Sequence, residues 1–375
     1  MKTVQYMQPK ITLMKFAIAK QVFLDGLNQV VNVVSSRPSM PILSNVLIEA
    51  EEGELKMRAT NLELIIVAKV PANVERSGSI TLPAKKLQSI IRELRDGEVL
   101  VDVVKTVANI KCNRAQFKLN GLPSDEFPEI PSFRETREFK IPQAMLSKAF
   151  RCTEYAMSFD STRNVLNGIF TSFRDGKLTL VATDGRRLAL FENELEFPES
   201  QQVDIILPCR SVSEIHRLLG DAGDVRVQIS NTQAAFEFGD TLLITKLTDG
   251  NYPNYRQVIP SRYSQRIELP TEEFLEIVRR VSLLSSEKTN TVRFQFSDNK
   301  LTVLSSTTEI GEAQEEMPIS YEGKDLLITF NADFMIAPLK AVNEDTITLD
   351  LIDQSSPGVM RVADEFLYVL MPMHS

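Results

Sequence analysis

The chain has 375 residues, of which 43% are hydrophobic and 25% charged, a composition that is ordinary for a globular protein with a sizeable core. Its 42 Lys and Arg against 50 Asp and Glu give a net charge of −8, which by itself argues against tight nucleic-acid binding because phosphate neutralisation supplies most of that affinity. No apolar run approaches the roughly 18 residues that span a bilayer, and the N-terminus lacks the continuous apolar segment of a signal peptide, so we expect a cytoplasmic protein with no membrane partner.

One short pattern, two apolar residues at strand spacing followed by a helix start, occurs three times in the chain. It occupies residues 16–23, 139–146 and 267–274, with starts 123 and 128 residues apart. Such self-similarity at a nearly fixed period indicates tandem copies of one structural unit. Three small domains are therefore favoured over one large fold, in agreement with the length of the chain.

Two further patterns keep this register. Apolar segments at residues 55–61, 178–184 and 301–307 start 123 residues apart, and the segment from Leu122 to Pro128 is matched 125 residues later by Leu247 to Pro253. We therefore predict an N-terminal extension at residues 1–13 and three copies of one domain at residues 14–133, 137–262 and 265–375.

Each copy divides again into two half-units. Pro83, Pro208 and Asn331 each stand where an alternating apolar segment turns into a helical one, and proline and asparagine suit such a junction. In the first expected helix, the apolar residues between Phe23 and Val34 fall on one face of a 3.6-residue period. The helices are therefore expected to bury one narrow stripe and to expose a polar face.

The segments between the expected helices alternate apolar and polar residues. Val225 to Ile229 is an example, and Asp175-Gly176 and Asp298-Asn299 are hairpin signals between two such segments. Half-buried antiparallel strands with helices on one face form α+β domains. The predicted fold is therefore α+β, with six half-units of strand, helix and then several antiparallel strands.

Basic residues gather on the polar faces of the expected helices, whereas acidic residues cluster elsewhere. The basic set is Lys85, Lys86, Arg92, Lys148, Arg151, Arg210, Arg217, Arg279 and Arg280, and the acidic clusters run from Glu49 to Glu54 and from Glu309 to Glu316. Each basic residue alone fits a solvated helix face. Together they indicate a surface that faces phosphate, which would reconcile the net charge with nucleic-acid binding.

No catalytic centre can be assembled from the sequence. The only histidines are His216 and His374, no Ser/His/Asp or Cys/His arrangement can be built, and no glycine-rich nucleotide motif occurs. Cys112, Cys152 and Cys209 are not at metal-binding spacing and are expected to be inert thiols. We expect neither a cofactor nor a metal.

Two segments allow alternative interpretations. Residues 184–187, Asp-Gly-Arg-Arg, fit either a turn that ends a strand or a grip on phosphate. The apolar C-terminal segment, residues 368–375, fits either an edge strand or a methionine-rich groove for partner peptides.

Four separated motifs occur along the chain in a fixed order: Arg37 to Asn45, Ala182 to Ala189, Tyr252 to Arg256, and Met371 to Met373. Together they resemble the bacterial sliding-clamp family, the beta subunits of the DNA polymerase III holoenzyme, over residues 14–375. The resemblance implies three copies of the DNA-clamp domain per chain. It also implies a ring-shaped head-to-tail homodimer with helices lining a central hole and antiparallel sheets outside.

The function implied by the resemblance is that of a non-enzymatic processivity factor that encircles double-stranded DNA. Basic side chains facing the hole meet phosphate charge whatever the sequence, so the ring slides and is retained by enclosure rather than by grip. The resemblance assigns the DNA contacts to Arg37, Lys85, Arg163 and Arg210. Near Arg163 the chain departs from the family pattern of a Gln and tandem tyrosines, because Asp160, Asn164 and Val165 stand there.

A hydrophobic pocket is also implied, which takes short Gln-plus-Leu-Phe-type peptides of the replicative polymerase, repair polymerases and the clamp loader. Its residues would be Leu166, Thr183, Gly185, Arg187, Leu188, Pro253, Val258, Val369, Met371, Pro372 and Met373. At its rim, Gln257 and the final His374-Ser375 differ from the family pattern.

For the dimer seam, the resemblance places Phe117 and Leu119 of one partner against Leu283 and Leu284 of the other. Lys86 and Arg114 would face Glu309, Glu312, Glu315 and Glu316. The alternative for the four apolar residues is an ordinary place in the core.

Two other functions compete with the clamp. A non-ring scaffold or regulator built from the same domains would bind peptides without surrounding DNA, and the departures at Asp160, Asn164 and Val165 favour it. A hydrolase built from the repeats lacks a nucleophile–base pair.

Overall fold

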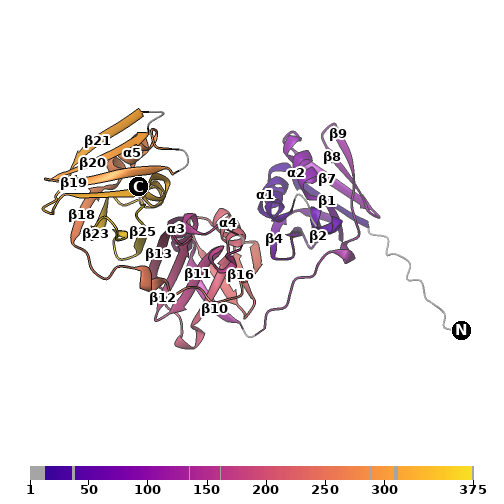
Figure 1. Ribbon diagram of the computed structural model, residues 1–375. Helices are drawn as coiled ribbons and strands as arrows, with labels where there is room; N and C mark the ends of the chain where they lie inside the picture. The colour runs from indigo at the N-terminus through magenta and orange to yellow at the C-terminus, as the bar shows by residue number, and fades with distance from the viewer. Residues whose placement is uncertain are drawn as a thin grey trace. The chain divides into compact units, whose positions relative to one another are not determined.

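The computed structural model of the chain describes residues 13–35, 39–134, 136–160, 162–286, 289–307 and 311–373. Its elements pass three times through the same order, except that the first pass holds one additional strand, Asn73–Arg76 (Figure 1). The first pass consists of β1 (Leu13–Ala19), α1 (Lys20–Val30), β2 (Asn45–Glu51), β3 (Glu54–Thr60), β4 (Leu64–Pro71), β5 (Asn73–Arg76), β6 (Gly78–Pro83), α2 (Ala84–Glu93), β7 (Glu98–Val104), β8 (Val107–Cys112) and β9 (Ala115–Asn120).

The second pass consists of β10 (Arg137–Pro142), α3 (Gln143–Thr153), β11 (Gly168–Arg174), β12 (Lys177–Thr183), β13 (Arg187–Glu194), β14 (Val203–Pro208), α4 (Cys209–Leu218), β15 (Asp224–Ile229), β16 (Gln233–Phe238) and β17 (Thr241–Lys246). The third consists of β18 (Gln265–Pro270), α5 (Thr271–Ser282), β19 (Thr291–Ser297), β20 (Lys300–Thr307), β21 (Gly311–Pro318), β22 (Leu326–Asn331), α6 (Ala332–Ala341), β23 (Thr346–Leu351), β24 (Gly358–Val362) and β25 (Phe366–Leu370). The predicted half-unit of strand, helix and antiparallel strands is therefore confirmed.

The described residues form two compact units, each with two antiparallel sheets. The first unit spans Met1–Pro142 and Arg217–Lys246 and holds a five-stranded sheet, β5-β1-β7-β8-β9, and an eight-stranded sheet, β10-β15-β16-β17-β4-β3-β2-β6. The second spans Gln143–His216 and Leu247–Ser375 and holds an eight-stranded sheet, β14-β11-β12-β13-β25-β24-β23-β18, and a four-stranded sheet, β21-β20-β19-β22.

Both eight-stranded sheets join strands of two successive passes. In the first unit β17 pairs with β4, with Leu243 opposite Ile66, and in the second β13 pairs with β25, with Leu188 opposite Val369. A continuous ladder of backbone hydrogen bonds therefore ties neighbouring copies together, and the strands of the middle copy are divided between two sheets.

The hairpin and helix-stripe predictions are confirmed. Asp175 and Gly176, which join β11 to β12, have φ of 53° and 70°, and Asp298 and Asn299, which join β19 to β20, have φ of 39° and 59°. Positive φ at both central residues is what the right-handed strand twist demands of a two-residue hairpin. Of the predicted stripe, Phe23, Leu27 and Val30 lie in α1 and are fully buried, whereas Val31 and Val34 are buried beyond the end of the helix.

The strand-to-helix junctions are also where the sequence predicts them. Pro83 immediately precedes α2 and Pro208 immediately precedes α4. At the third junction the Asn331 side chain accepts the backbone N–H of Phe334 at 3.0 Å, which satisfies an otherwise unpaired donor of the first turn of α6.

The edge-strand interpretation of the C-terminal segment is wrong. β25 pairs with β13 on one side and with β24 on the other, and Tyr368, Val369 and Leu370 are each at most 3% exposed. An apolar run that is buried on both faces suits an interior strand. Beyond it, the Met373 amide donates to the Thr329 carbonyl at 2.8 Å.

The three cysteines are free thiols, with Cys112 and Cys152 buried and Cys209 half-buried. Burial raises the pKa of the Cys152 thiol to about 11, so that it stays protonated at neutral pH. Within the described ranges, no helix is long and apolar enough to cross a membrane, and no group of His, Cys, Asp and Glu is arranged to hold a metal ion.

We predict that Gly121→Ala destabilises the first unit. Thr81 and Leu122 exchange two backbone hydrogen bonds, at 3.2 and 3.0 Å, and a methyl carbon on Gly121 would stand 2.1 Å from the Thr81 carbonyl oxygen. The clash and the strained bond should lower the free energy of unfolding by about 3 kcal/mol in urea titrations.

The matched control is Gly53→Ala in the same unit. Its nearest neighbour would be 4.0 Å away, so that only its φ of 87° opposes the substitution, at a cost of about 1 kcal/mol. An equal loss in the two variants would contradict the assigned role of Gly121.

Candidate functional site

An apolar patch lies on the eight-stranded sheet of the second unit. Its buried members are Val181, Leu188, Tyr255, Val359 and Val369, and the half-buried side chains packed against them are Phe170, Leu190, Tyr252, Ile259 and Leu367. The Phe170 ring lies 5.3 Å from the Tyr252 ring and 5.8 Å from the Tyr255 ring, between centroids. We call this set the apolar cluster.

Strand register builds the cluster. Thr183 of β12 is opposite Leu188 of β13, which in turn is opposite Val369 of β25, and residues directly opposite on neighbouring strands share one face of a sheet. Leu188 and Val369 are each 2% exposed and form the floor, whereas Val258 is 51% exposed and Met371 43% exposed. The structure therefore brings several of the predicted pocket residues to one sheet face.

Pro253 and Val258 belong to the segment that covers this face. Tyr252, Tyr255 and Ile259 of the same segment pack on the apolar cluster, and residues Tyr255–Val258 form a short 3-10 helix. The exposed Pro253 and Val258 therefore border a buried apolar floor. Uncovered apolar side chains beside such a floor are typical of a binding groove.

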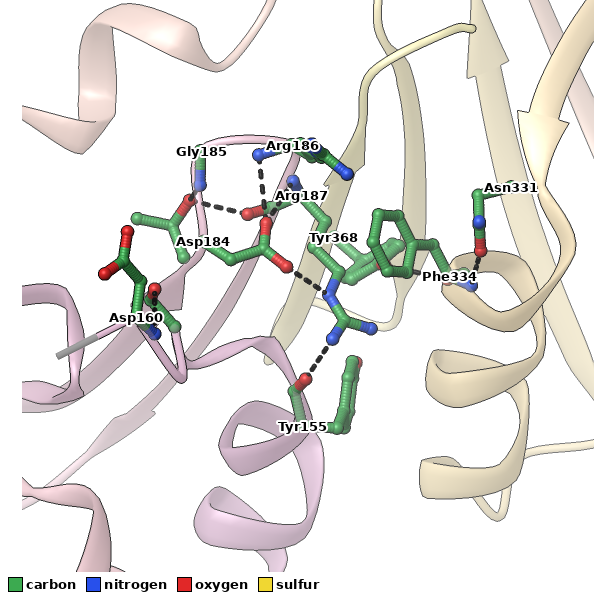
Figure 2. A network of polar contacts seen from close by, with 11 residues as sticks. Tyr155, Asp160, Asp184, Gly185, Arg186, Arg187, Asn331, Phe334 and Tyr368 are labelled. Atoms are coloured by element: carbon green, nitrogen blue, oxygen red, sulfur yellow. Dashed lines mark hydrogen bonds and ion pairs between the residues drawn. The ribbon is translucent and has the colours of Figure 1, made fainter. Parts of the chain in front are cut away.

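Residues 184–187 form a turn between β12 and β13, as one of the two interpretations predicts (Figure 2). One Asp184 oxygen accepts the backbone N–H groups of Arg186 and Arg187 at 2.9 and 3.1 Å. The Thr183 hydroxyl donates to the Arg187 carbonyl at 2.6 Å, and Gly185 has a φ of 89°, which favours glycine. The turn interpretation is confirmed.

Arg187 joins three elements at the other side of this turn (Figure 2). Its Nε lies 3.0 Å from Asp184 Oδ2, an Nη donates to the Tyr155 carbonyl, and its guanidinium carbon lies 4.2 Å from the centre of the Phe334 ring. The Tyr368 hydroxyl donates to the Phe334 carbonyl at 2.7 Å. Since the Arg187 side chain is only 12% exposed, this network fixes the turn, the segment after α3 and α6 against one another.

Sequence reasoning missed Tyr155, Phe334 and Tyr368. Phe334 lies in an apolar stretch of α6, where its spacing does not distinguish it from a core residue. Tyr155 and Tyr368 likewise carry no local signal. Only the fold brings these three rings around Arg187. The Arg187 guanidinium carbon lies 5.8 Å from the centre of the Tyr155 ring, and the centres of the Tyr155 and Tyr368 rings are 5.9 Å apart.

Beside the turn is an open cavity of about 400 Å³. It is lined by Ser158, Asp160, Arg163, Asp184, Gly185, Arg186 and Phe334. A methyl carbon on Gly185 would stand 3.4 Å from an Arg163 Nη. Arg163, predicted to contact DNA, therefore lies against Gly185, predicted to line the peptide pocket.

Asp160 holds Arg163 at this cavity. The Arg163 Nε lies 3.7 Å from an Asp160 oxygen, and the same carboxylate accepts the hydroxyl and the amide of Thr162 at 2.7 and 2.9 Å. These hydrogen bonds lower the pKa of Asp160 below its usual value. Asp160, which differs from the family pattern, is thus an acidic partner for Arg163.

The remaining predicted pocket residues lie at the border of the site. Leu166 is half-buried in a 3-10 helix, and its carbonyl accepts the amide of Ser158 at 3.0 Å. Met371 is held beside the turn because its amide donates to the Arg186 carbonyl at 3.0 Å. Pro372 and Met373 are half-buried.

Of the residues predicted to contact DNA, Lys85 on α2 and Arg210 at the start of α4 are exposed, and Arg37 lies outside the described residues, as do Glu309 and His374. The broader hypothesis of a basic surface needs correction at Arg280, which pairs with Glu276 and Glu315, and at Lys148. Lys148 is half-buried and lies 3.1 Å from Glu344 and 2.6 Å from Glu365, because packing of the second unit brings these carboxylates to α3.

The residues predicted for a dimer seam are not part of the core. Phe117 is 39% exposed and Leu283 78% exposed, while Leu119 and Leu284 are half-buried. Lys86 and Arg114 are exposed. Among the acidic residues, Glu312 accepts from Ser306 at 3.1 Å, Glu315 pairs with Arg280 at 2.6 Å, and Glu316 pairs with Lys300 at 3.0 Å.

Three family models match the chain in order. They describe the DNA polymerase III beta subunit, with its N-terminal domain at residues 14–131, its central domain at residues 140–254 and its C-terminal domain at residues 256–374. Together they account for nearly all of the sequence.

Relatives and solved structures agree with these models. The beta sliding clamps of Chlamydia trachomatis serovar D and Escherichia coli K12 are each 32% identical to this chain. Each match covers 96% of this chain, and the two matches cover 87% and 100% of the relatives, respectively. A sliding clamp of Pseudomonas aeruginosa bound to griselimycin superposes with a TM-score of 0.92 at 31% identity, over 96% of this chain and 100% of that one. The Bacillus subtilis clamp gives 0.92 at 29% identity, over 96% and 99%. The chain therefore belongs to the DNA polymerase III beta subunit family, the non-catalytic sliding clamps of the replicative polymerase.

Proposed function

We propose that two copies of this chain close head to tail into a ring around double-stranded DNA in the cytoplasm. The ring tethers the replicative polymerase, the clamp loader and repair polymerases through the apolar cluster and its border. A clamp built this way raises the local concentration of a polymerase at the primer end. The domains are assigned to residues 14–133, 137–262 and 265–375, after an extension at residues 1–13.

The single observation that carries the ring proposal is the pattern of sheets. Each eight-stranded sheet combines strands of two copies, whereas the five-stranded and four-stranded sheets each use one copy only. Within the described residues, the edge strand β9 is hydrogen-bonded to one strand, β8, and the edge strand β21 to one strand, β20. Pairing of β9 with β21 of a second chain would repeat the internal junction, as a closed head-to-tail assembly requires.

Exposed side chains on the first and third copies support the same pairing of β9 with β21. Phe117 of β9 is exposed, and Leu283 directly follows α5 with 78% of its surface exposed. Exposed large apolar groups are typical of an interface. Exposed Lys86 and Arg114 on the first copy would face Glu312, Glu315 and Glu316 on the third, of which Glu315 and Glu316 already pair with Arg280 and Lys300 within the chain.

Sliding follows from enclosure. Lys85 and Arg210, with Arg37, would meet phosphates of any sequence, so that no base contact fixes the ring at one site. Since release then requires an interface to open, a few weak phosphate contacts are sufficient, which agrees with a net charge of −8.

We predict that the protein stays on circular DNA and leaves linear DNA. Ring protein placed on nicked circular DNA by its loader should dissociate at least ten times faster once the circle is cut, because ends allow run-off without opening of the seam. Gel filtration of the DNA-bound protein before and after cutting measures this. Equal retention on both forms would remove the ring mechanism.

Leu283→Asp should break the seam. A carboxylate placed on an interface residue that is 78% exposed in the single chain costs little in the monomer and several kcal/mol in a closed interface. Sedimentation should therefore show half the mass of the wild type. The control is Leu62→Asp, because Leu62 is 41% exposed on the first copy away from the proposed seam. If both variants remain dimers, the assignment of Leu283 to the dimer interface is wrong.

Met371→Ala combined with Leu188→Ala should weaken binding of a Gln-Leu-Phe-type peptide at least tenfold, as measured by fluorescence anisotropy, because both contribute apolar surface to the groove. The mass of the assembly should not change. Leu180→Ala is the matched control for Leu188→Ala, because Leu180 is equally buried in β12 with its side chain on the opposite sheet face. Unchanged peptide affinity in the double variant would show that the pocket lies elsewhere.

A further inference from the structure

The sheet face that carries the apolar cluster continues into a charged region. Register places Leu188 opposite Val369, Val369 opposite Val359, Val359 opposite Asp350, and Asp350 opposite Arg266. These five residues therefore form one row on one face, across β13, β25, β24, β23 and β18. At about 4.8 Å per strand, the row changes from apolar to charged within about 15 Å.

A buried carboxylate organises the charged end. Asp350 is 4% exposed. Arg266 donates to both of its oxygens, at 2.7 and 2.8 Å, and the Arg361 Nε donates at 3.0 Å. Burial alone would raise the pKa of Asp350, but the hydrogen bonds from the two arginines outweigh it and the pKa lies below its usual value. The carboxylate is thus ionised and fully engaged.

These side chains border a cavity of about 210 Å³. Its lining includes Arg262, Tyr263, Arg266, Asp350, Val359 and Arg361. The Arg266 guanidinium lies 4.1 Å from the centre of the Tyr263 ring, which holds it flat against the wall. Three guanidinium groups face one carboxylate, so that the cavity carries an excess of positive charge. We call it the arginine cavity.

Arg262 is an exposed arginine of the cavity, and Val359 connects the cavity to the apolar cluster. Arg262 is exposed, and within the described residues it has no ion-pair partner. Val359 belongs both to the arginine cavity and to the apolar cluster. The apolar cluster and the arginine cavity therefore adjoin each other on one sheet face.

We propose that the arginine cavity binds a carboxylate side chain of the same extended peptide whose apolar residues occupy the cluster. Val369 and Asp350 are two strand spacings apart, about 10 Å, and an extended chain rises about 3.3 Å per residue. The acidic residue is therefore three or four positions from the apolar anchor. Guanidinium groups pair with carboxylates in a bidentate geometry, which selects Asp or Glu at that position. The inference rests on the proposed peptide-binding function.

The test uses the full chain and three fluorescent peptides that share one Gln-Leu-Phe-type anchor. One carries Asp-Glu three and four residues before the anchor, one carries them after it, and one carries Asn-Gln at both places. One acidic peptide should bind about fivefold tighter than the amide peptide in anisotropy titrations. In Arg262→Gln and in Arg361→Gln the ratio of the two dissociation constants should fall below two.

Arg76→Gln on β5 is the control, because it removes one exposed positive charge in the other unit and should leave the fivefold ratio unchanged. Arg361→Gln keeps the two Arg266 bonds to Asp350 but loses one charge-assisted hydrogen bond to this buried carboxylate, so its thermal midpoint should fall while circular dichroism shows the native fold. The proposal is overturned if both acidic peptides bind no tighter than the amide peptide, or if the ratio survives both arginine variants. Failure of the amide peptide to bind the wild type rejects the peptide groove itself.

Discussion

Pairing of strands from successive copies is the constraint on which the candidate site depends. β13 and β25 are about 180 residues apart in sequence, and they become neighbours only because Leu188 and Val369 stand opposite each other in one ladder. The bond from the Met371 amide to the Arg186 carbonyl extends this ladder past the end of β25. The turn at residues 184–187 and the C-terminal methionine are thereby brought to one place. Because the ladder consists of backbone hydrogen bonds, it does not require particular side chains at the junction.

Much of the fold is predictable from the sequence, because its signals are local. The hairpin at Asp175-Gly176, the helix junction at Asn331 and the repeat itself each depend on a few neighbouring residues. What could not be predicted is set by contacts between distant segments. The interior position of β25 depends on β13, and the burial of Lys148 depends on Glu344 and Glu365. For the site, the motifs identify Leu188 and Val369 by resemblance, whereas the rings around Arg187 have no signature along the chain.

The charge distribution is consistent with retention by enclosure. Several helix arginines and lysines are neutralised within the chain, as Arg280 is by Glu276 and Glu315, and therefore contribute little to a general attraction for DNA. A protein that gripped DNA by charge would lose affinity steeply with each such pair. In the proposed ring, affinity for phosphate only has to keep the duplex mobile in the hole, so an acidic chain is compatible with the function.

In the proposed peptide groove, the row from Leu188 to Arg266 would separate affinity from selectivity. Burial of apolar side chains on the cluster would provide most of the binding free energy, at about 25 cal/mol per Å², but many apolar sequences would satisfy it. A charge pair at the end of the row adds less free energy and discriminates more, because a like charge or an unpaired group there is penalised. Asp350 makes this possible. It holds Arg266 and Arg361 in place before any ligand arrives, so that little side-chain entropy remains to be lost on binding, and it leaves the exposed Arg262 as the group that first meets an incoming carboxylate.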